Sequence, residues 1–580
     1  MDLVGLWKFI FLHLLVGNLR LPGFCSSQKA PPYEFVQDAT TAPVFLNVDY
    51  IVIGGGTSGC PLAATLSENA TVLLLERGGS PYGNPNIANI GNFVQSLADV
   101  RPDSVAQLFI SEDGVFNTRP RVLGGGSAVN AGFYTHASVE DVKRAGWDQE
   151  LVNKSYEWVE KKVAFEPEIK QWESAVRDGL IEVGVVPFNG YTYDHINGTK
   201  VGGTIFDKDG HRHTAADLLQ YANPTNIKVL LHATVHKILF TGIGTPWLTR
   251  KPRAYGVIFK DKLGLLHKAC LKFDTKNEII LSAGALGSPQ LLMLNGIGPA
   301  NHLLAHGIPV LADQPMVGQG MADNPLNLLF VPSPLPVEVS LVQVVGITSF
   351  GSYIETASGL SVSPILGHTL IQEYELFLNK TGQSSEVTEV AMARAIEAVQ
   401  TLVNITLQGG FVAEKILGPR SSGELKLKTL NPDDNPSVSF NYFKEPEDLE
   451  ICVQGMKTVI DVINSKAFSK FRYPDMSVES LVKLILDLPL NLRPRHVTAP
   501  SSLEQFCKDT VVTIWHYHGG CQVGKVVDPD YKVLGIDGLR VIDGSTFLFS
   551  PGTNPQATVM MLGRYMGRKI LDSRLSTMRK

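Results

Sequence analysis

The sequence is poor in cysteine and shows no spacing typical of a metal site. Six cysteines occur among 580 residues, without a C-x-x-C pair or a His/Cys cluster. His211 and His213 lie close together, but no third ligand is near them in sequence, and a structural zinc site needs four. Lysine and arginine (51) do not outnumber aspartate and glutamate (56), so the basic surface of a nucleic-acid-binding protein is also absent. We therefore expect neither a metal ion nor a nucleic-acid partner.

No apolar run approaches the ~20 residues that a membrane-spanning helix needs. The run at 9–16 follows Lys8 and precedes Cys25-Ser26-Ser27, which is typical of a secretory signal over residues 1–27. An uncleaved anchor is the alternative, because Arg20 and Pro22 blur the boundary. After signal removal we expect no transmembrane segment, and an extracellular, cell-wall or endoplasmic reticulum location. Five N-x-[ST] triplets are compatible with this route: Asn69, Asn153, Asn197, Asn379 and Asn404.

Five cysteines remain after the expected signal. Cys452 and Cys507 flank a helical, polar segment and are the candidates for one disulfide. Cys60 follows a glycine turn on a helix that must pack tightly, which favours a buried small residue over a redox centre.

The stretch 49–79 predicts a strand, a glycine turn, a helix and a second strand. Gly54, Gly56 and Gly59 have the G-x-G-x-x-G spacing, which permits a tight turn and a close approach to a pyrophosphate. Backbone N–H groups from Thr57 and Ser58 onward would hold phosphates at the helix start. Glu76 ends the second strand 20 positions after Gly56 and suits a ribose hydroxyl. The motif indicates a dinucleotide but does not separate FAD from NAD.

Similar units recur along the chain. Gly124–Gly126 exposes N–H groups for an anion or a flat ring, although a flexible loop is the alternative. A strand expected at 278–282 is followed by small residues, and one expected at 539–542 is followed by Asp543. Residues 28–47 predict an extended lead-in, and 80–117 an irregular excursion. From 313 to about 505, alternating apolar segments and amphipathic stretches such as 386–403 predict a domain built on an antiparallel sheet with helices.

The C-terminal segment offers a general base beside a glycine backbone. It reads Trp515-His516-Tyr517-His518-Gly519-Gly520, and histidine moves protons near neutral pH. In an extended chain His516 and His518 would point to the same side, so sequence geometry does not choose between them. A structural histidine is the alternative for either.

Four separated stretches resemble the glucose-methanol-choline (GMC) flavoprotein oxidoreductases. They are the N-terminal glycine motif, RVLGGGSAVNAG at 121–132, SAGALGSPQLLMLNGIGP at 282–299, and the segment from WHYHGGC to GRYMG at 515–567. They occur in family order, and the similarity spans nearly the whole mature chain. Details such as AGFYTHA and WHYHGGC resemble the plant HOTHEAD-like branch, which is related to the (R)-mandelonitrile lyases.

The resemblance implies an α/β, Rossmann-like FAD-binding domain that is discontinuous (48–130, 199–312 and 510–575). It also implies an α+β substrate domain on an antiparallel sheet (131–198 and 313–509). The residues it implies for FAD are Gly54, Gly56, Thr57, Ser58, Gly59, Glu76, Arg77, Leu123, Gly126, Ser127, Asn130, Val235, Trp515, His516, Asp543, Gly544, Asn554, Gln556 and Ala557.

His516 is the base that the resemblance implies, and Asn554 is its partner. The family's hydroxynitrile lyases have His followed by Pro-Gln-Gly at the partner position, whereas this chain has Asn554-Pro555-Gln556-Ala557, as alcohol-oxidising members do. We therefore expect a monomeric FAD enzyme in which His516 accepts the hydroxyl proton of a primary alcohol while hydride passes to the flavin. Long-chain ω-hydroxy fatty acids of cuticle formation are the substrates that the resemblance implies. A hydroxynitrile lyase with structural FAD and a non-catalytic secreted flavoprotein are the alternatives.

Overall fold

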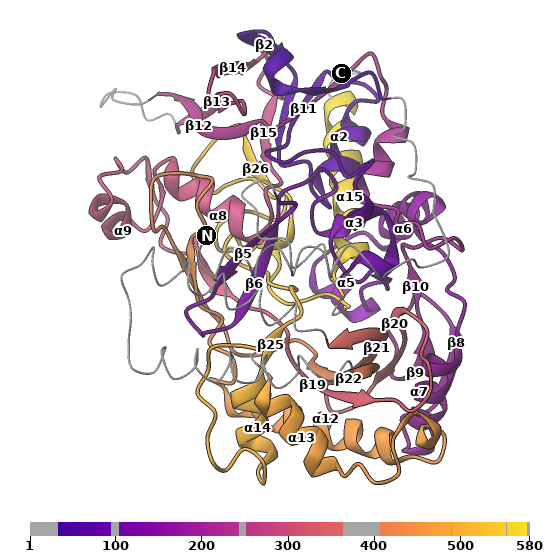
Figure 1. Cartoon of the computed structure of the whole chain (residues 1–580). Helices are drawn as coiled ribbons and strands as arrows, with labels where there is room; N and C mark the ends of the chain where they lie inside the picture. The colour runs from indigo at the N-terminus through magenta and orange to yellow at the C-terminus, as the bar shows by residue number, and fades with distance from the viewer. Residues whose placement is uncertain are drawn as a thin grey trace, which may run out of the picture.

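The computed structural model describes residues 33–93, 104–242, 251–362, 407–488, 490–552 and 554–576. The expected signal at 1–27 and the amphipathic stretch at 386–403 lie outside these ranges. Two sheets organise the described chain: a parallel sheet in the upper half of Figure 1, and a larger, mostly antiparallel sheet below it. None of the helices in the described ranges has the length and hydrophobicity to cross a bilayer.

The parallel sheet has six strands with the glycine-motif strand inside it. In spatial order they are β1 (Val36–Asp38), β11 (Ile227–Leu231), β4 (Val72–Leu75), β3 (Tyr50–Ile53), β15 (Glu278–Leu281) and β26 (Leu539–Val541). Every residue of β3, β4 and β15 is buried, as expected for strands covered on both faces. Alternate residues enter different cores: Tyr50 and Val52 pack on one side, Ile51 and Ile53 on the other.

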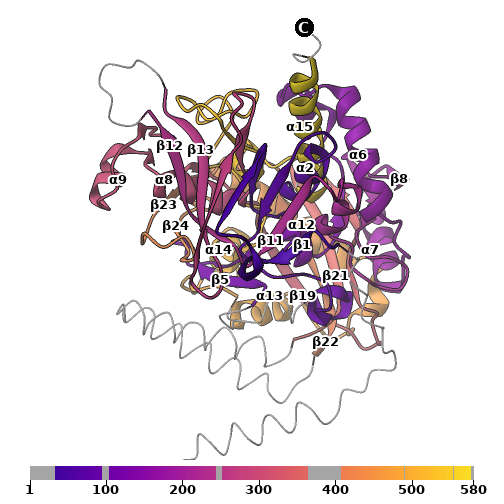
Figure 2. The same ribbon diagram turned by 90° about the horizontal axis from the view of Figure 1, so that it is seen from above.

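Helices cover one face of this sheet, and a second sheet with one helix covers the other (Figure 2). The first face carries α2 (Gly59–Leu66), α6 (Gln149–Val163) and α15 (Gln556–Ser576). The opposite face carries α8 (Gly284–Leu294) and a four-stranded sheet of β12 (Thr234–Thr241), β13 (Arg253–Lys260), β14 (Leu266–Leu271) and β2 (Phe45–Val48). Helix α15 lies close against α2 because Gly563 has no side chain: a Cβ there would lie 2.3 Å from the Ser58 carbonyl oxygen.

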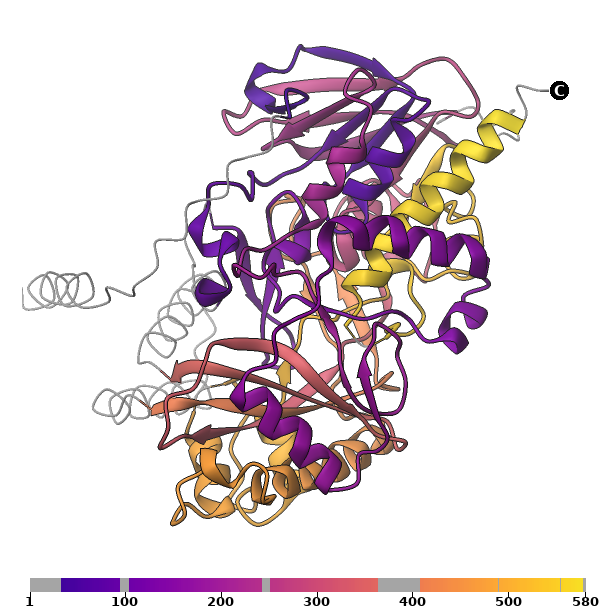
Figure 3. The same cartoon turned by 90° about the vertical axis from the view of Figure 1, so that its right-hand side faces the viewer.

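The second large sheet has seven strands. In order they are β25 (Val512–Thr513), β19 (Pro325–Pro332), β22 (Leu407–Ile416), β21 (Ser352–Val362), β20 (Ser340–Ile347), β9 (Gly198–Val201) and β8 (Phe188–Tyr191). All neighbours are antiparallel except β8 and β9, so the sheet is mixed. In Figure 3 helices lie beneath it: α7 (Gln171–Glu182), α12 (Pro446–Asn464), α13 (Val478–Asp487) and α14 (Leu503–Thr510).

Shorter elements connect these layers. They are α3 (Pro85–Ala88), β5 (Ala106–Ile110), β6 (Phe116–Pro120), β7 (Phe133–Tyr134), α5 (Val139–Arg144), β10 (Gly203–Thr204), β16 (Ile297–Gly298), α9 (Ala300–Ala305), β17 (Ala312–Asp313), β18 (Gln319–Met321), β23 (Gly423–Lys426) and β24 (Ser437–Val438).

Several local expectations were wrong in detail. The lead-in at 28–47 supplies two edge strands, β1 and β2, because both pair with strands far along the chain. The excursion at 80–117 contains most of the β5–β6 hairpin. The strand expected at 511–515 is limited to β25, since the backbone turns at Trp515, whose φ is 59°.

The expected domain boundaries also differ from the packing. Residue 199 falls within β9, which belongs to the seven-stranded sheet. Helix α6, expected in the substrate domain, packs with α2 and α15 through Val152, Tyr156 and Val159. The apolar face of α6 packs in the same core as α2 and α15. By its contacts, α6 therefore belongs with the parallel sheet.

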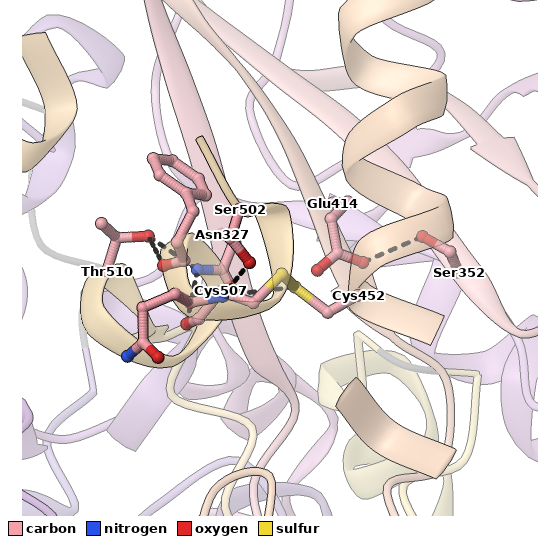
Figure 4. The surroundings of a disulfide bond; sticks show 9 residues. Asn327, Ser352, Glu414, Cys452, Ser502, Cys507 and Thr510 are labelled. Atoms are coloured by element: carbon pink, nitrogen blue, oxygen red, sulfur yellow. Dashed lines mark hydrogen bonds between the residues drawn. A yellow bond between two sulfur atoms is a disulfide. The ribbon is translucent and has the colours of Figure 1, made fainter. Parts of the chain in front are cut away.

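The structure joins Cys452 on α12 to Cys507 on α14 by a disulfide (Figure 4). Both cysteines are fully buried. Asn327 of β19 lies beside the bond, and its Nδ2 donates to the Cys507 carbonyl at 3.0 Å and to Thr510 Oγ1 at 2.9 Å. The bridge thereby fixes α14, which leads directly into β25 and the segment of His516.

We expect the double substitution Cys452→Ser and Cys507→Ser to lower the free energy of unfolding by about 4 kcal/mol, because the bridge closes a loop with a sequence separation of 55. Thermal unfolding with and without dithiothreitol measures this. The double variant should lose its response to the reductant, whereas Cys270→Ser, at a free cysteine, should keep it. An unfolding midpoint equal to that of the wild type would contradict a stabilising bridge.

Candidate active site

A pocket lies where the parallel strands β3, β4, β15 and β26 end. In open α/β sheets this carboxyl edge is where ligands bind. Ten of the predicted residues line the pocket: Gly54, Gly56, Thr57, Ser58, Glu76, Arg77, Gly126, Val235, Asp543 and Gly544. Segments separated by nearly 500 residues in sequence therefore meet around one space.

Backbone atoms make close contacts at the edge of this pocket. Gly54 has a φ of 104°, and a Cβ there would lie 2.4 Å from the Ser282 carbonyl oxygen. At Gly125, with a φ of 56°, a Cβ would lie 2.8 Å from Gly56 Cα. These residues must be glycine, because any side chain would clash with the backbone of the neighbouring turn.

Glu76 is buried and holds the glycine turn in place. Its Oε2 accepts a hydrogen bond from Gly55 N–H at 2.9 Å, and its Oε1 accepts one from Gly78 N–H at 2.7 Å. Burial raises the pKa of this carboxyl, opposed by the same N–H groups. Each carboxylate oxygen has a further lone pair, so the predicted contact with a ribose hydroxyl is compatible with these bonds.

Two arginines give the pocket a positive character. Arg77 and Arg119 both line it, and the Nη1 of each is buried without a hydrogen-bond partner among the described residues. Burial lowers the pKa of Arg119, and the neighbouring charge of Arg77 lowers it further. A buried guanidinium nitrogen without a hydrogen-bond partner is costly, and an anion beside it relieves that cost. The pocket therefore fits a dinucleotide cofactor with a pyrophosphate.

Asp543 connects two turns at the pocket. Its Oδ2 accepts from Gly284 N–H at 3.0 Å and from Ser288 Oγ at 2.5 Å, and its Oδ1 accepts from Ser545 N–H at 2.8 Å. Burial raises the pKa of this carboxyl. The carboxylate thus ties the start of α8 to the strand end of β26.

The remaining predicted residues lie behind or beside the pocket. Leu123 and Gly59 pack against the glycine turn. Ser127 Oγ donates to the Gly124 carbonyl. Asn130 Nδ2 donates to Gln556 Oε1 at 2.9 Å, which links the second glycine loop to the start of α15. Ala557 is fully buried in that helix.

His516 is anchored through its backbone by a buried carboxylate. Asp323 Oδ1 accepts from His516 N–H at 2.9 Å, while Asp323 Oδ2 accepts from Thr513 Oγ1 at 2.6 Å and Tyr442 Oη at 2.5 Å. Burial raises the pKa of Asp323 to about 6. This network holds the chain at Trp515 in its left-handed turn, so the side chain of His516 is placed by residues outside its own segment.

The two histidines of the segment have different surroundings. His518 is 4% exposed, and its Nδ1 contacts the His516 carbonyl at 3.0 Å. Burial lowers the pKa of His518 to about 4. His516 is partly exposed, and its pKa is lowered well below the usual value by burial and then by Lys415 and His518. A neutral imidazole that remains accessible is what a general base requires.

Lys415 of β22 interacts with both predicted catalytic residues. Its Nζ donates to Asn554 Oδ1 at 2.8 Å and to Glu355 Oε2 at 2.5 Å. Its charge also contributes to the lowered pKa of His516. Lys415 thus bonds Asn554 directly and acts on His516 through its charge.

Sequence reasoning missed Arg119, Asp323 and Lys415. A lysine in the largely apolar strand FVAEKIL was the available signal for Lys415, since a buried charge needs a reason. The small residues that follow the strand expected at 278–282 also line the pocket, which their pattern alone does not predict.

The sequence predicted no third ligand near His211 and His213, but the structure brings two aspartates close to His211. His213 Nδ1 contacts Asp217 Oδ2 at 3.1 Å, while one ligand atom each from Asp207, Asp209 and His211 lies within 4.8 Å of the others. This cluster lies in a surface turn, and we still predict no metal there.

The chain is similar to GMC oxidoreductases over most of its length. Profiles described as GMC oxidoreductase match residues 48–326 and 419–563. Protein HOTHEAD of Arabidopsis thaliana is 54% identical over 91% of this chain and 88% of its own length. An (R)-mandelonitrile lyase-like protein of the same plant is 45% identical over 98% of both chains. Sinalpyl alcohol oxidase Nec3 of Nesocodon mauritianus is 42% identical over 93% of this chain and 92% of its own.

A solved structure shares the fold. A formate oxidase variant of Aspergillus oryzae RIB40, studied for its FAD modification, superposes with a TM-score of 0.70 at 19% identity, covering 92% of this chain and 100% of that one. Together with the glycine turn, the arginine-lined pocket and the parallel sheet, these similarities identify the protein: the chain belongs to the GMC oxidoreductase family of FAD-dependent enzymes.

Proposed function

We propose that the chain oxidises a primary alcohol, with His516 as the base and Asn554 as the hydrogen-bonding partner of the substrate oxygen. The observation that carries this proposal is the pairing of an accessible imidazole of lowered pKa with an amide held by Lys415. One base and one amide suffice for alcohol oxidation.

In this reaction His516 accepts the proton of the substrate hydroxyl. Bound FAD supplies the two-electron acceptor that takes hydride from the carbinol carbon, so the alcohol leaves as an aldehyde. Asn554 hydrogen-bonds the oxygen as its negative charge develops. The residues predicted from the sequence would hold FAD, with Glu76 at its ribose, and Arg119 would join Arg77 near its phosphates. The contribution of the protein is orientation and electrostatic stabilisation.

Two similarities support this choice of substrate class. The relative sinalpyl alcohol oxidase is an alcohol oxidase by name. Protein HOTHEAD has a higher sequence identity to this chain, 54% against 42%. The resemblance to the HOTHEAD-like branch favours long-chain ω-hydroxy fatty acids of cuticle formation within that class. We further propose that the protein enters the secretory route: it carries a buried disulfide, and Asn69, Asn153 and Asn197 are exposed.

A hydroxynitrile lyase is the second candidate, because a mandelonitrile lyase-like protein is 45% identical. Lyase chemistry shuttles a proton and stabilises cyanide, for which a second imidazole is useful. Position 554 holds an amide instead. A non-catalytic flavoprotein is the third candidate.

Anaerobic mixing with alcohols of increasing chain length should bleach the absorbance of the bound flavin, since hydride reaches it before any oxidant can act. The series also reports the preferred chain length. Cleavage of mandelonitrile while the flavin stays oxidised, with no alcohol reducing it, would establish the lyase and sink the redox proposal.

His516→Ala should lower the rate of flavin reduction by about 10²- to 10⁴-fold, the usual contribution of a general base. The rate is normalised to the FAD content of each protein, because His516 is also among the residues that the resemblance implies for FAD. An unchanged reduction rate would leave no catalytic role for His516 and favour the non-catalytic reading.

The pH dependence of kcat/KM follows from the lowered pKa of His516. The base works when it is neutral, so activity should fall only as the pH drops through a pKa below 6.5. The measurement should use an uncharged alcohol, because its own ionisation then does not contribute to the pH profile. An acid inflection at or above pH 6.5 is the result that this explanation does not allow.

A further inference from the structure

Lys415 is a buried charge for which the fold supplies a specific set of partners. Its side chain is fully buried, at 0% exposure. Besides Glu355 and Asn554, its Nζ lies 4.4 Å from the centroid of the Tyr353 ring. Isolated buried ammonium groups are costly, so each of these contacts offsets a part of the desolvation.

The register of β21 and β22 explains how these partners converge. Lys415 pairs directly with Tyr353, and Glu355 lies two residues further along the same strand, so all three share one face of the sheet. The neighbouring residues Glu414 and Ser352 point the other way, towards α12 and the disulfide (Figure 4). Lys415 is therefore directed by strand alternation towards the loop that carries Asn554.

The chemistry of the ammonium group defines the orientation of the amide. A lysine ammonium has three donors and no acceptor. It can therefore bind the Oδ1 of Asn554 and not the Nδ2. With Oδ1 held by Lys415, the donating end of the amide is directed away from β22. An amide without such a partner can rotate by half a turn and exchange donor for acceptor.

We propose that Lys415, held by Glu355, is a positioning residue that orients the Asn554 amide so that its Nδ2 donates to the substrate oxygen. This inference rests on the alcohol oxidation proposed above and adds the residue that makes Asn554 a donor. A donor strengthens its hydrogen bond as the oxygen becomes more negative, whereas the amide oxygen would repel that charge.

The electrostatics of the site are consistent with this role. Burial lowers the pKa of Lys415, and Glu355 opposes the effect by charge and by hydrogen bonding. Lys415 in turn helps to keep His516 neutral. The other groups that face His516 are His518 from its own segment and Asp323, which accepts its backbone N–H. Removing the ammonium should therefore raise the pKa of His516.

A double-mutant cycle on flavin reduction tests the inference in the FAD-loaded enzyme. Lys415→Met should slow reduction by about 10²-fold in the otherwise wild-type chain, a magnitude typical of misplaced reacting groups. At a pH where His516 is neutral in every variant, the same substitution in an Asn554→Ala background should have little further effect, because the residue that Lys415 orients is gone. Equal effects in both backgrounds would overturn the positioning role.

Two further measurements separate positioning from loss of structure. In Lys415→Met the acid inflection of kcat/KM should move to higher pH, and Lys415→Arg, which keeps a cation and its donors, should recover part of the rate. Lys200→Met is the matched control: Lys200 is another buried lysine of this sheet, on β9, and bonds Thr135 and the Asp194 carbonyl. Its effect should be the same with and without Asn554. An unmoved inflection in Lys415→Met counts against the inference.

The effect of Lys415→Met on stability can be separated from its effect on catalysis. Lys415→Met leaves Glu355 as a lone buried carboxylate, so Lys415→Met with Glu355→Gln provides a second form of the variant for the cycle. NMR of ¹³C-labelled histidine, assigned with His516→Ala, reads the pKa of His516 without any turnover. If no alcohol reduces the wild-type flavin, the proposed function fails; if reduction occurs but Lys415→Met slows it equally with and without Asn554, the inference alone fails.

Discussion

The contact between the Gly54 turn and the Ser282 carbonyl is the constraint on which the cofactor half of the molecule depends. Strands β3 and β15 pair in register and end together, so the turns that follow them compete for one space. Only a residue without Cβ at 54 resolves that competition. The third segment, at Gly125, enters the same space, and Asp543 fixes the position of α8 from the neighbouring strand. The shape of the pocket therefore depends mainly on close backbone contacts, and side chains such as Asp543 add to them.

The parts of the fold that follow local rules could be predicted from the sequence. Strands β3, β4 and β15 are short apolar runs bounded by glycine or acid, and the glycine spacing defines the turn that follows β3. The predicted pocket residues with the strongest local signal, Gly54, Gly56 and Glu76, lie together at the pocket.

What the sequence did not predict depends on long-range contacts. Strand β1 has three residues and exists because it pairs with β11, almost 200 positions away. The turn at Trp515 is imposed by Asp323, which looks like an ordinary loop acid in the sequence. Lys415 stands out as a charge in a largely apolar strand, but the sequence does not identify its partners Glu355 and Asn554. In each case the position of the side chain or strand depends on a partner that is distant in sequence and that no local pattern identifies.

The parallel sheet also has a consequence for biosynthesis. Its edge strand β26 is formed by residues 539–541, and the pocket is lined by residues from Ile53 to Val559. Helix α15, which covers α2, lies within the last 25 residues of the chain. Translation proceeds from the N-terminus, so the glycine turn leaves the ribosome hundreds of residues before its closing wall exists. The nascent chain cannot complete the pocket until Val559 has been synthesised, so enclosure of the cofactor comes long after the glycine turn has formed.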